Sequence, residues 1–263
     1  MSRPEIQEAL AQLDDLTRRL RRECPWDREQ DERSIVPHTV EEAYELADAA
    51  NAGDDARLLD ELGDVLFQVH FLSLLMEERG AGDLAAVAEH CRQKLIRRHP
   101  HVFGDTEADD AAQVLRNWDA IKSGEPGRES GIFGEVPENL PGPLLARKVQ
   151  RRAASSGFDL EGVDGPLSAL HAGLEQLEAA TETQGRETAF EAVGDVLFAA
   201  VNVARKLKVD PELALRASAG RFRARVEDAE RLAEEAGERW DALPFEAQLR
   251  FYANAALIKE TES

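Results

Sequence analysis

An internal repeat constrains the fold of this chain more than any other feature of its 263-residue sequence. The segment Glu61-Leu-Gly-Asp-Val-Leu-Phe67 returns in the second half of the chain as Ala192-Val-Gly-Asp-Val-Leu-Phe198. Both copies fall in the middle of a region with helical periodicity, and a Gly- and Pro-rich segment separates them. We interpret this pattern as a tandem duplication, so the chain should form two similar units.

Apolar residues recur at the spacing of α-helices in both halves of the chain, and the alternating runs typical of strands do not occur. We therefore predict an all-α protein with an N-terminal domain at 1–122, a Gly/Pro-rich linker at 123–143 and a C-terminal domain at 144–263. The predicted helices cover about residues 4–22, 37–51, 56–79, 84–98, 111–122, 144–155, 167–183, 187–206, 211–236 and 245–257.

Composition limits the partners and the compartment. Acidic residues outnumber basic residues by 52 to 32, which gives a formal net charge of -20. A chain this acidic repels nucleic acid polymers and anionic membranes, so we expect neither as a main partner. No apolar run is long enough to span a bilayer, the N-terminus lacks the apolar segment of a signal peptide, and two cysteines make no disulfide framework. We expect a cytoplasmic protein.

Acidic side chains gather on the second and third predicted helices. Glu42 and Glu45 are three residues apart, as are Glu61 and Asp64, so each pair lies on one helix face. Apolar neighbours place both faces beside the core, and the short turn between the helices predicts an antiparallel arrangement. The two acid pairs should therefore face each other across a helix interface.

Carboxylates that gather at one interface raise each other's pKa, and a hard divalent cation removes this conflict. Oxygen-only ligands suit magnesium or manganese. The alternative is an ordinary acidic helix face in water. A ferritin-like di-iron centre would need Glu-x-x-His pairs, and the second pair here is Glu-x-x-Asp, which disfavours iron.

The combination of these acids resembles a known family signature. Glu41-Glu42-Ala-Tyr-Glu45 followed by Glu61-Leu-Gly-Asp64 is similar to the E-E-x-x-E … E-x-x-D pattern of the MazG family of all-α nucleoside triphosphate pyrophosphatases. Cys24-Pro-Trp-Asp27, Arg97-Arg-His-Pro-His-Val-Phe103 and the region from Trp118 to Lys122 look like further blocks of that family. The resemblance covers nearly the whole chain, including its tandem layout.

The resemblance implies hydrolysis of ribo- and deoxynucleoside triphosphates, (d)NTPs, to (d)NMP and pyrophosphate, an acid-anhydride hydrolysis that clears surplus or aberrant nucleotides. It implies Mg²⁺, with Mn²⁺ as a possible substitute, held by Glu42, Glu45, Glu61 and Asp64. Glu41 completes the implied catalytic set by orienting a ligand or water. The family is typically dimeric, so we expect a homodimer of chains that each contain two four-helix-bundle units.

Basic and aromatic residues supply candidates for substrate contacts. Lys94, Arg97 and Arg98 share a helix face and are interpreted as a clamp for the triphosphate. The alternative is a group of cations that stabilises the C-terminal end of the helix. Trp26 is a candidate for stacking on a base, with packing of the first helix as the equal alternative.

The second half departs from the signature. A single carboxylate cannot hold a dehydrated cation, so we expect the active site in the N-terminal half and a structural or regulatory role for the C-terminal repeat. Two other functions stay open: a nucleotide-binding regulatory module without turnover, and a helical scaffold for protein partners. The residues that align with the five acids of the first half are Ala172, Gly173, Gln176, Ala192 and Asp195.

Overall fold

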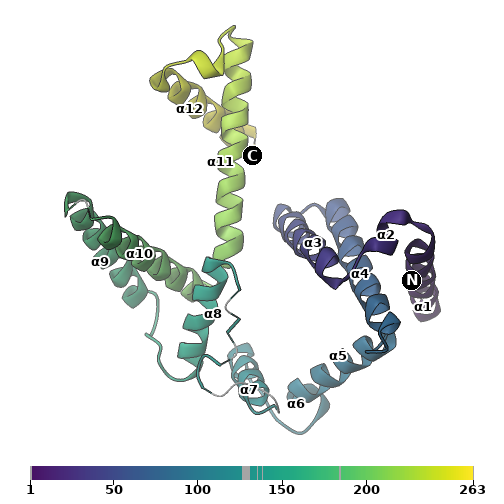
Figure 1. The fold of residues 1–263 in the computed structure, drawn as a ribbon. Coiled ribbons are helices and arrows are strands. Elements are labelled where there is room, and N and C mark those ends of the chain that lie inside the picture. Colours follow the sequence, from purple (N-terminus) through teal and green to yellow (C-terminus); the bar gives the residue numbers. More distant parts are fainter. Residues whose placement is uncertain (1, 126–130, 135, 138, 184, 263) are drawn as a thin grey trace. The chain divides into compact units, whose positions relative to one another are not determined.

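The described part of the computed structural model consists of α-helices and short connections without a β-strand, which confirms the all-α prediction (Figure 1). The chain separates into two compact units, Met1–Glu135 and Val136–Ser263, and we describe each by itself. None of the described helices is long and apolar enough to cross a membrane. The segment expected as a linker includes residues outside the described ones. The structure describes residues 2–125, 131–134, 136–137, 139–183 and 185–262.

The first unit is arranged around α4, against which α1, α3 and α5 each pack. A small core joins α3 to α4 through Ile35, Phe71 and Leu75. Ion pairs Arg18–Glu77 and Arg21–Glu78 fasten α1 to the end of α4. The helices described in this unit are α1 (Arg3–Glu23), α2 (Pro25–Glu29), α3 (Glu32–Ala52), α4 (Asp55–Glu78), α5 (Leu84–Arg98), α6 (Pro100–Phe103) and α7 (Ala111–Ser123).

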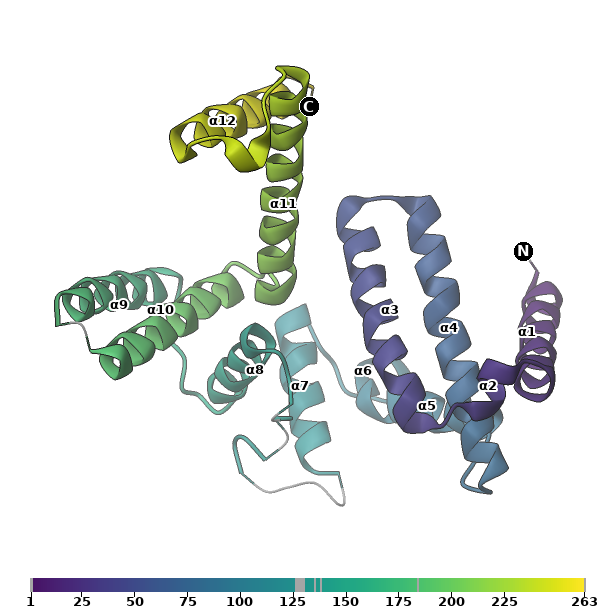
Figure 2. The same cartoon turned by 45° about the horizontal axis from the view of Figure 1, so that its top comes forward.

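Helices α3 and α4 form an antiparallel hairpin with a short turn made by Gly53 and Asp54 (Figures 1 and 2). The turn begins at Gly53, whose φ of 70° lies in the left-handed region that glycine adopts without strain. Asp54 then caps α4, because its side chain accepts hydrogen bonds from the backbone N–H groups of Ala56 and Arg57. The short turn fixes the register of the two helices, and this register positions the acidic residues.

The second unit contains a similar hairpin, formed by α9 and α10, with α8 packed on α10 and α11 and with α12 packed on α11. The two helix boundaries at its turn repeat those of the first hairpin at one constant offset: α3 ends at position 52 and α4 begins at 55, and α9 ends at 183 and α10 begins at 186. This agreement supports the tandem repeat. The elements are α8 (Gly142–Ser155), α9 (Asp164–Thr183), α10 (Arg186–Lys206), α11 (Pro211–Glu235), the 3-10 helix η1 (Trp240–Ala242) and α12 (Phe245–Glu262).

Two local predictions near the first hairpin are wrong. Helix α3 begins at Glu32 rather than at Pro37, because the Asp31 side chain accepts from two backbone N–H groups and starts the helix earlier. Pro37 therefore lies inside α3 rather than in its first turn. The segment after Cys24 lies between the predicted helices 4–22 and 37–51, but it forms the short helix α2, since Pro25 suits the first turn of a helix.

The buried face of α4 also differs from the prediction. Three residues of the buried face that the sequence predicts, Leu62, Leu66 and Val69, are exposed. The other three predicted residues, Leu58, Val65 and Leu72, are half-buried. The buried apolar residues of α4 lie instead toward its C-terminal end, at Phe71, Leu74 and Leu75. The ion pairs from α1 reach that same end, whereas Leu59, Leu62 and Leu66 in the first half of α4 are exposed.

Candidate active site

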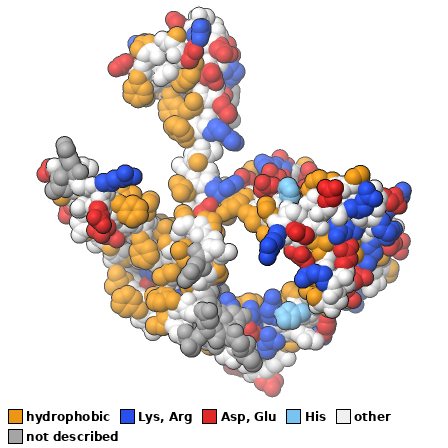
Figure 3. All heavy atoms as spheres, viewed as in Figure 1, with side chains coloured by type: hydrophobic (Ala, Val, Ile, Leu, Met, Phe, Trp, Pro, Cys, Tyr) orange, Lys and Arg blue, Asp and Glu red, His pale blue; other side chains and the backbone are white. Residues whose placement is uncertain are grey.

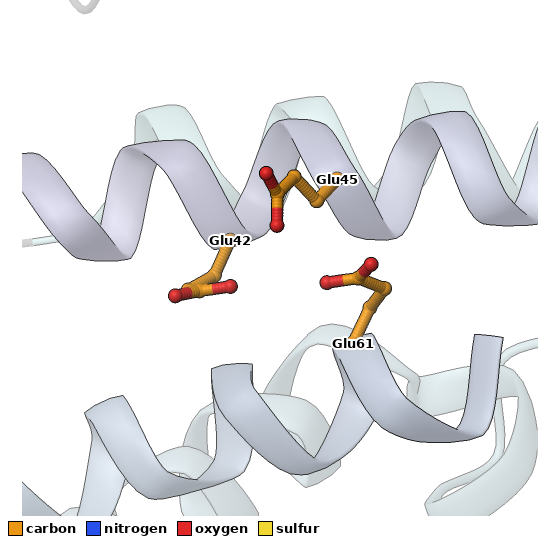
Figure 4. A group of neighbouring side chains, drawn as sticks. All are labelled: Glu42, Glu45 and Glu61. Carbon is orange, nitrogen blue, oxygen red and sulfur yellow. The ribbon is translucent and has the colours of Figure 1, made fainter. Parts of the chain in front are cut away.

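Three carboxylates converge between α3 and α4. Glu42 and Glu45 come from α3 and Glu61 comes from α4, and one oxygen of each lies within 4.8 Å of the others. Figure 4 shows the three side chains reaching into the space between the two helices. The three-residue spacing on α3 and the register set by the short turn produce this convergence. We call these three residues the carboxylate cluster.

The environment of the carboxylate cluster is unfavourable for three negative charges. Glu61 is buried, Glu42 is half-buried and Glu45 is exposed. Burial raises the pKa of Glu42 above its ordinary value, and the nearby charges of Asp64, Glu45, Glu61 and Glu41 raise it further. A divalent cation relieves both the repulsion and the desolvation of such an oxygen-only set. The residues present therefore fit Mg²⁺ or a similar hard cation.

The two other predicted acids lie at the edge of the cluster. Asp64 is exposed and is not one of the three converging residues, although its charge contributes to the raised pKa of Glu42. The structure places the Asp64 carboxylate outside the converging set, even though Asp64 is three residues from Glu61 just as Glu45 is from Glu42. Glu41 is exposed, and its Oε2 lies 3.2 Å from Nδ1 of His38.

A cation that the sequence analysis missed contacts the cluster. Arg57 lies one turn before Glu61 on α4, and its Nε donates to Glu61 Oε1 over 3.3 Å. The side chain of Arg57 is 47% exposed, whereas that of Glu61 is almost completely buried. The four-residue spacing of Arg57 and Glu61 is the signal that indicates such a pair in a sequence.

Two arginines of the predicted phosphate clamp form ion pairs with an acidic residue of the same unit. Arg97 and Arg98, at the end of α5, both donate to Glu125, with Nη2 distances of 2.7 Å and 2.6 Å. Arg98 is buried, and its guanidinium carbon lies 5.4 Å from the centre of the Trp118 ring. Lys94 is half-buried on the same helix. Both arginines are therefore paired with Glu125, which follows α7.

Trp26 lies on α2 beside the signature segment. Its side chain is 51% exposed, and its ring meets that of His38 edge-on with 5.8 Å between the centroids. His38 in turn contacts Glu41. The tryptophan is therefore not part of a closed core, and its proposed stacking on a base stays a prediction.

The second hairpin offers different side chains at the equivalent positions. Where the first hairpin has Glu42, Glu45 and Glu61, the second has Gly173, Gln176 and Ala192. A Cβ on Gly173 would lie 3.3 Å from Val196 Cγ2, so α9 and α10 approach closely at that point. A pocket of about 330 Å³ opens nearby, lined in part by Gln176 and Ala192. Among the described residues of this unit, no group of potential metal ligands like that of the first hairpin occurs.

Comparisons with known proteins show the family of this chain. The family model for the MazG nucleotide pyrophosphohydrolase domain matches residues 30–103, which include α3, α4 and α5. The nucleoside triphosphate pyrophosphohydrolase/pyrophosphatase MazG of Thermotoga maritima is 38% identical over 239 residues, which cover 90% of this chain and 91% of that protein. The nucleoside triphosphate pyrophosphohydrolase of Escherichia coli K12 is 36% identical over 213 residues, 80% of this chain and 81% of that protein. Because these similarities extend across both units and include the carboxylate cluster, the chain belongs to the MazG family.

Proposed function

We propose that this protein is a nucleoside triphosphate pyrophosphohydrolase with its active site at the carboxylate cluster of the first unit. It hydrolyses (d)NTPs to (d)NMP and pyrophosphate. The observation that carries the proposal is the convergence of Glu42, Glu45 and Glu61 within the segment that matches the MazG domain model. The names of the relatives from Thermotoga maritima and Escherichia coli support the same reaction.

The proposal assigns Mg²⁺ to the carboxylate cluster, with Mn²⁺ as a substitute. Glu42, Glu45 and Glu61 hold the cation, Asp64 serves as a further ligand at the edge, and Glu41 orients a ligand or water. A bound divalent cation supplies neutralisation of the phosphate charge and activation of water. The protein positions the carboxylate oxygens, because the burial of Glu61 and the short turn between the helices keep these oxygens close together.

Substrate contacts are assigned to basic and aromatic residues of the first unit. Lys94, Arg97 and Arg98 lie within the matched segment and are proposed to bind the triphosphate, and Trp26 is proposed to stack on the base. Binding through Arg97 and Arg98 requires that the substrate replace the carboxylate of Glu125. We therefore assign catalysis to the domain from 1 to 122. The domain from 144 to 263 is assigned a structural or regulatory role without a metal site of its own.

We further propose that the protein is a homodimer. Large apolar side chains are open to water in both units: Leu59 on α4 is 75% exposed and Phe190 on α10 is 80% exposed. Figure 3 shows apolar side chains gathered over α9 and α10, at the left of the view. A second copy that covers such surfaces would remove them from water. Light scattering after size-exclusion chromatography tests this, and a monomeric mass at micromolar concentration would contradict it.

The proposed role is removal of surplus or aberrant nucleotides in the cytoplasm, where (d)NTPs are present. Both cysteines, Cys24 and Cys91, are free thiols, which suits a reducing compartment. Localisation of the tagged protein in cell fractions tests this assignment, and recovery outside the cytoplasm would contradict it.

Product analysis tests the reaction directly. The purified protein is incubated with each common NTP and dNTP in the presence of Mg²⁺, and the products are followed by phosphorus NMR. We expect the monophosphate and pyrophosphate to appear together. Orthophosphate as the first product would contradict the proposal, and binding without any product would support the regulatory alternative. The Glu61→Gln protein, prepared in the same way, controls for contaminating phosphatases.

A further inference from the structure

An exposed histidine extends the face of α3 that carries the carboxylate cluster, and no role described above uses its outer nitrogen. Positions 38, 42 and 45 follow the four- and three-residue spacing of one helix face, so His38 lies one turn before Glu42. The side chain of His38 is 45% exposed. A ligand whose phosphates lie at the cluster therefore has an imidazole beside it, one turn along α3.

Two contacts fix the orientation of the His38 ring. Its Nδ1 lies 3.2 Å from Oε2 of Glu41, and its plane stands at 64° to that of Trp26 with 5.8 Å between the ring centroids. An ionised carboxylate only accepts hydrogen bonds, so Nδ1 is the donor, and Nε2 of the neutral ring keeps a lone pair as an acceptor. Within the described part of the chain, this Nε2 forms no hydrogen bond. His38 thus presents one unused acceptor.

Trp26 is held in place beside this acceptor. Its short helix α2 is fastened to α1, because the guanidinium of Arg21 donates to the main-chain oxygens of Asp27 and Gln30. With a side chain that is 51% exposed, Trp26 is open to a ligand from solvent. A base that stacks on Trp26 lies parallel to its ring and therefore far from parallel to the ring of His38. This orientation suits a contact of His38 with the edge of the base, where the hydrogen-bonding groups lie.

We propose that His38 is a specificity-determining residue that accepts a hydrogen bond from the exocyclic amino group of a base stacked on Trp26. This inference rests on the proposed function and deepens it. Adenine and cytosine carry an amino group where hypoxanthine and uracil carry a carbonyl oxygen. The lone pair of Nε2 attracts the amino group and opposes the carbonyl oxygen, so the contact separates the two classes. The favoured substrates are therefore ATP, CTP and their deoxy forms.

The contact with Glu41 allows a second role, in which His38 only orients that carboxylate beside the cluster. The two roles change different quantities. Loss of an orienting contact lowers kcat/KM for every triphosphate by the same factor, because the phosphates and the metal are common to all of them. Loss of a contact with the base changes the ratio of kcat/KM between bases.

Kinetics with paired substrates test the inference on His38→Phe and His38→Gln. We expect the unaltered protein to prefer ATP over ITP and CTP over UTP by about tenfold in kcat/KM, as for one hydrogen bond made or opposed. His38→Phe keeps a ring without an acceptor, so both ratios should fall to within about twofold of one. His38→Gln should keep part of the preference, because its amide oxygen accepts near the position of Nε2.

His171→Phe is the matched control, since His171 is also an exposed histidine of a hairpin helix, on α9 of the second unit. Ratios in His38→Phe equal to those in His171→Phe would overturn the inference. So would an equal fall of kcat/KM for all four triphosphates in His38→Phe, because His38 would then act through Glu41. The proposed function fails separately, if the unaltered protein forms no pyrophosphate from any triphosphate or if Glu61→Gln keeps full turnover.

Discussion

The hairpins α3–α4 and α9–α10 share their register but differ in the chemistry of the face between their helices. The ends of their helices at the turn coincide when the two repeats are aligned. At three matched positions, however, the first has glutamates and the second has Gly173, Gln176 and Ala192. The register therefore does not depend on the acids. A repeat can lack the acids proposed to hold the metal while its helices keep their packing, so the shared fold alone does not predict shared activity.

The two hairpins also differ in how closely their helices pack at the matched positions. In the second hairpin, α9 comes so close to α10 that a Cβ at Gly173 would lie 3.3 Å from Val196. In the first hairpin the matched residue is Glu42, half-buried and with a raised pKa. Partly buried like charges oppose folding, so the first hairpin keeps them at a cost in stability. This contrast supports the proposal that the active site lies in the first hairpin.

The largest expected difference between the hairpins is the loss of turnover when one of their acids is replaced by its amide. We expect Glu45→Gln and Glu61→Gln each to lower kcat by a factor on the order of 10² to 10³, because a charged group that positions the reaction is removed. Asp195→Asn, the exposed acid in the matched region of α10, should leave kcat unchanged. Pyrophosphate release measures all three. A large loss in Asp195→Asn would place activity in the second hairpin and break the comparison.

Restoration of acids to the second hairpin is the next test. The double variant Gln176→Glu, Ala192→Glu places carboxylates where the pocket of about 330 Å³ has room for them. We expect it to gain Mn²⁺ binding about 10- to 100-fold weaker than that of the first hairpin, because Gly173 still provides no ligand. A Mn²⁺ titration in a Glu61→Gln background isolates the new site. Absence of any gain would show that the hairpins differ in more than these side chains.

An ion pair that fastens the second hairpin predicts a pH-dependent stability. Asp159 pairs with Arg205 and Lys206 of α10, and hydrogen bonding to Arg205 lowers the pKa of Asp159 to about 2. The stabilisation is therefore complete above the ordinary pKa of an aspartate and disappears as the pH falls toward 2. Asp159→Asn should lose about 1 kcal/mol of unfolding free energy at pH 7.

Urea denaturation at several pH values measures this loss. The difference between Asp159→Asn and the unaltered protein should shrink steadily below pH 4. Asp241→Asn is the control, since its pair with Arg239 is far more exposed. A difference that stays constant from pH 7 to pH 2 would mean that Asp159 does not act through its charge.

Replacement of matched helical glycines by alanine should have the smallest predicted effect, a change in the free energy of unfolding. Gly63 and Gly194 occupy equivalent positions in α4 and α10, and a Cβ at either would meet nothing within 4 Å. Alanine at each should raise the unfolding free energy by about 0.5–1 kcal/mol, because glycine loses more chain entropy in a helix. Gly173→Ala should gain less, since its Cβ would press on Val196. Unequal effects at 63 and 194 would show that the two faces are not equivalent.

Local signals predicted helix boundaries where a cap and a stop were both present. Helix α5 follows the cap Asp83 and ends before Pro100, and its predicted limits agree with the structure. The predicted start of α3 at residue 37 is wrong because the cap at Asp31 begins the helix earlier. The burial of α4 was missed because it depends on where α1 packs, which periodicity does not reveal.

Local patterns in the sequence also predicted part of the candidate site. Spacing along the helices and a short turn brought Glu42, Glu45 and Glu61 together, as the sequence predicted. The sequence could not show that Asp64 lies outside the converging set, because this depends on the rotation of α4 about its axis. Contacts between Arg97 or Arg98 and Glu125 join residues 28 and 27 positions apart, so no local pattern indicates them.

Binding of Mn²⁺ to the intact chain tests the central contrast most directly. Electron paramagnetic resonance titrations would compare the unaltered protein, the triple variant Glu42→Gln, Glu45→Gln, Glu61→Gln and the single variant Asp195→Asn. We predict that the triple variant loses the tight Mn²⁺ binding and that Asp195→Asn retains it. Tight binding that survives in the triple variant, or that disappears in Asp195→Asn, would contradict the assignment of the metal site to the first hairpin.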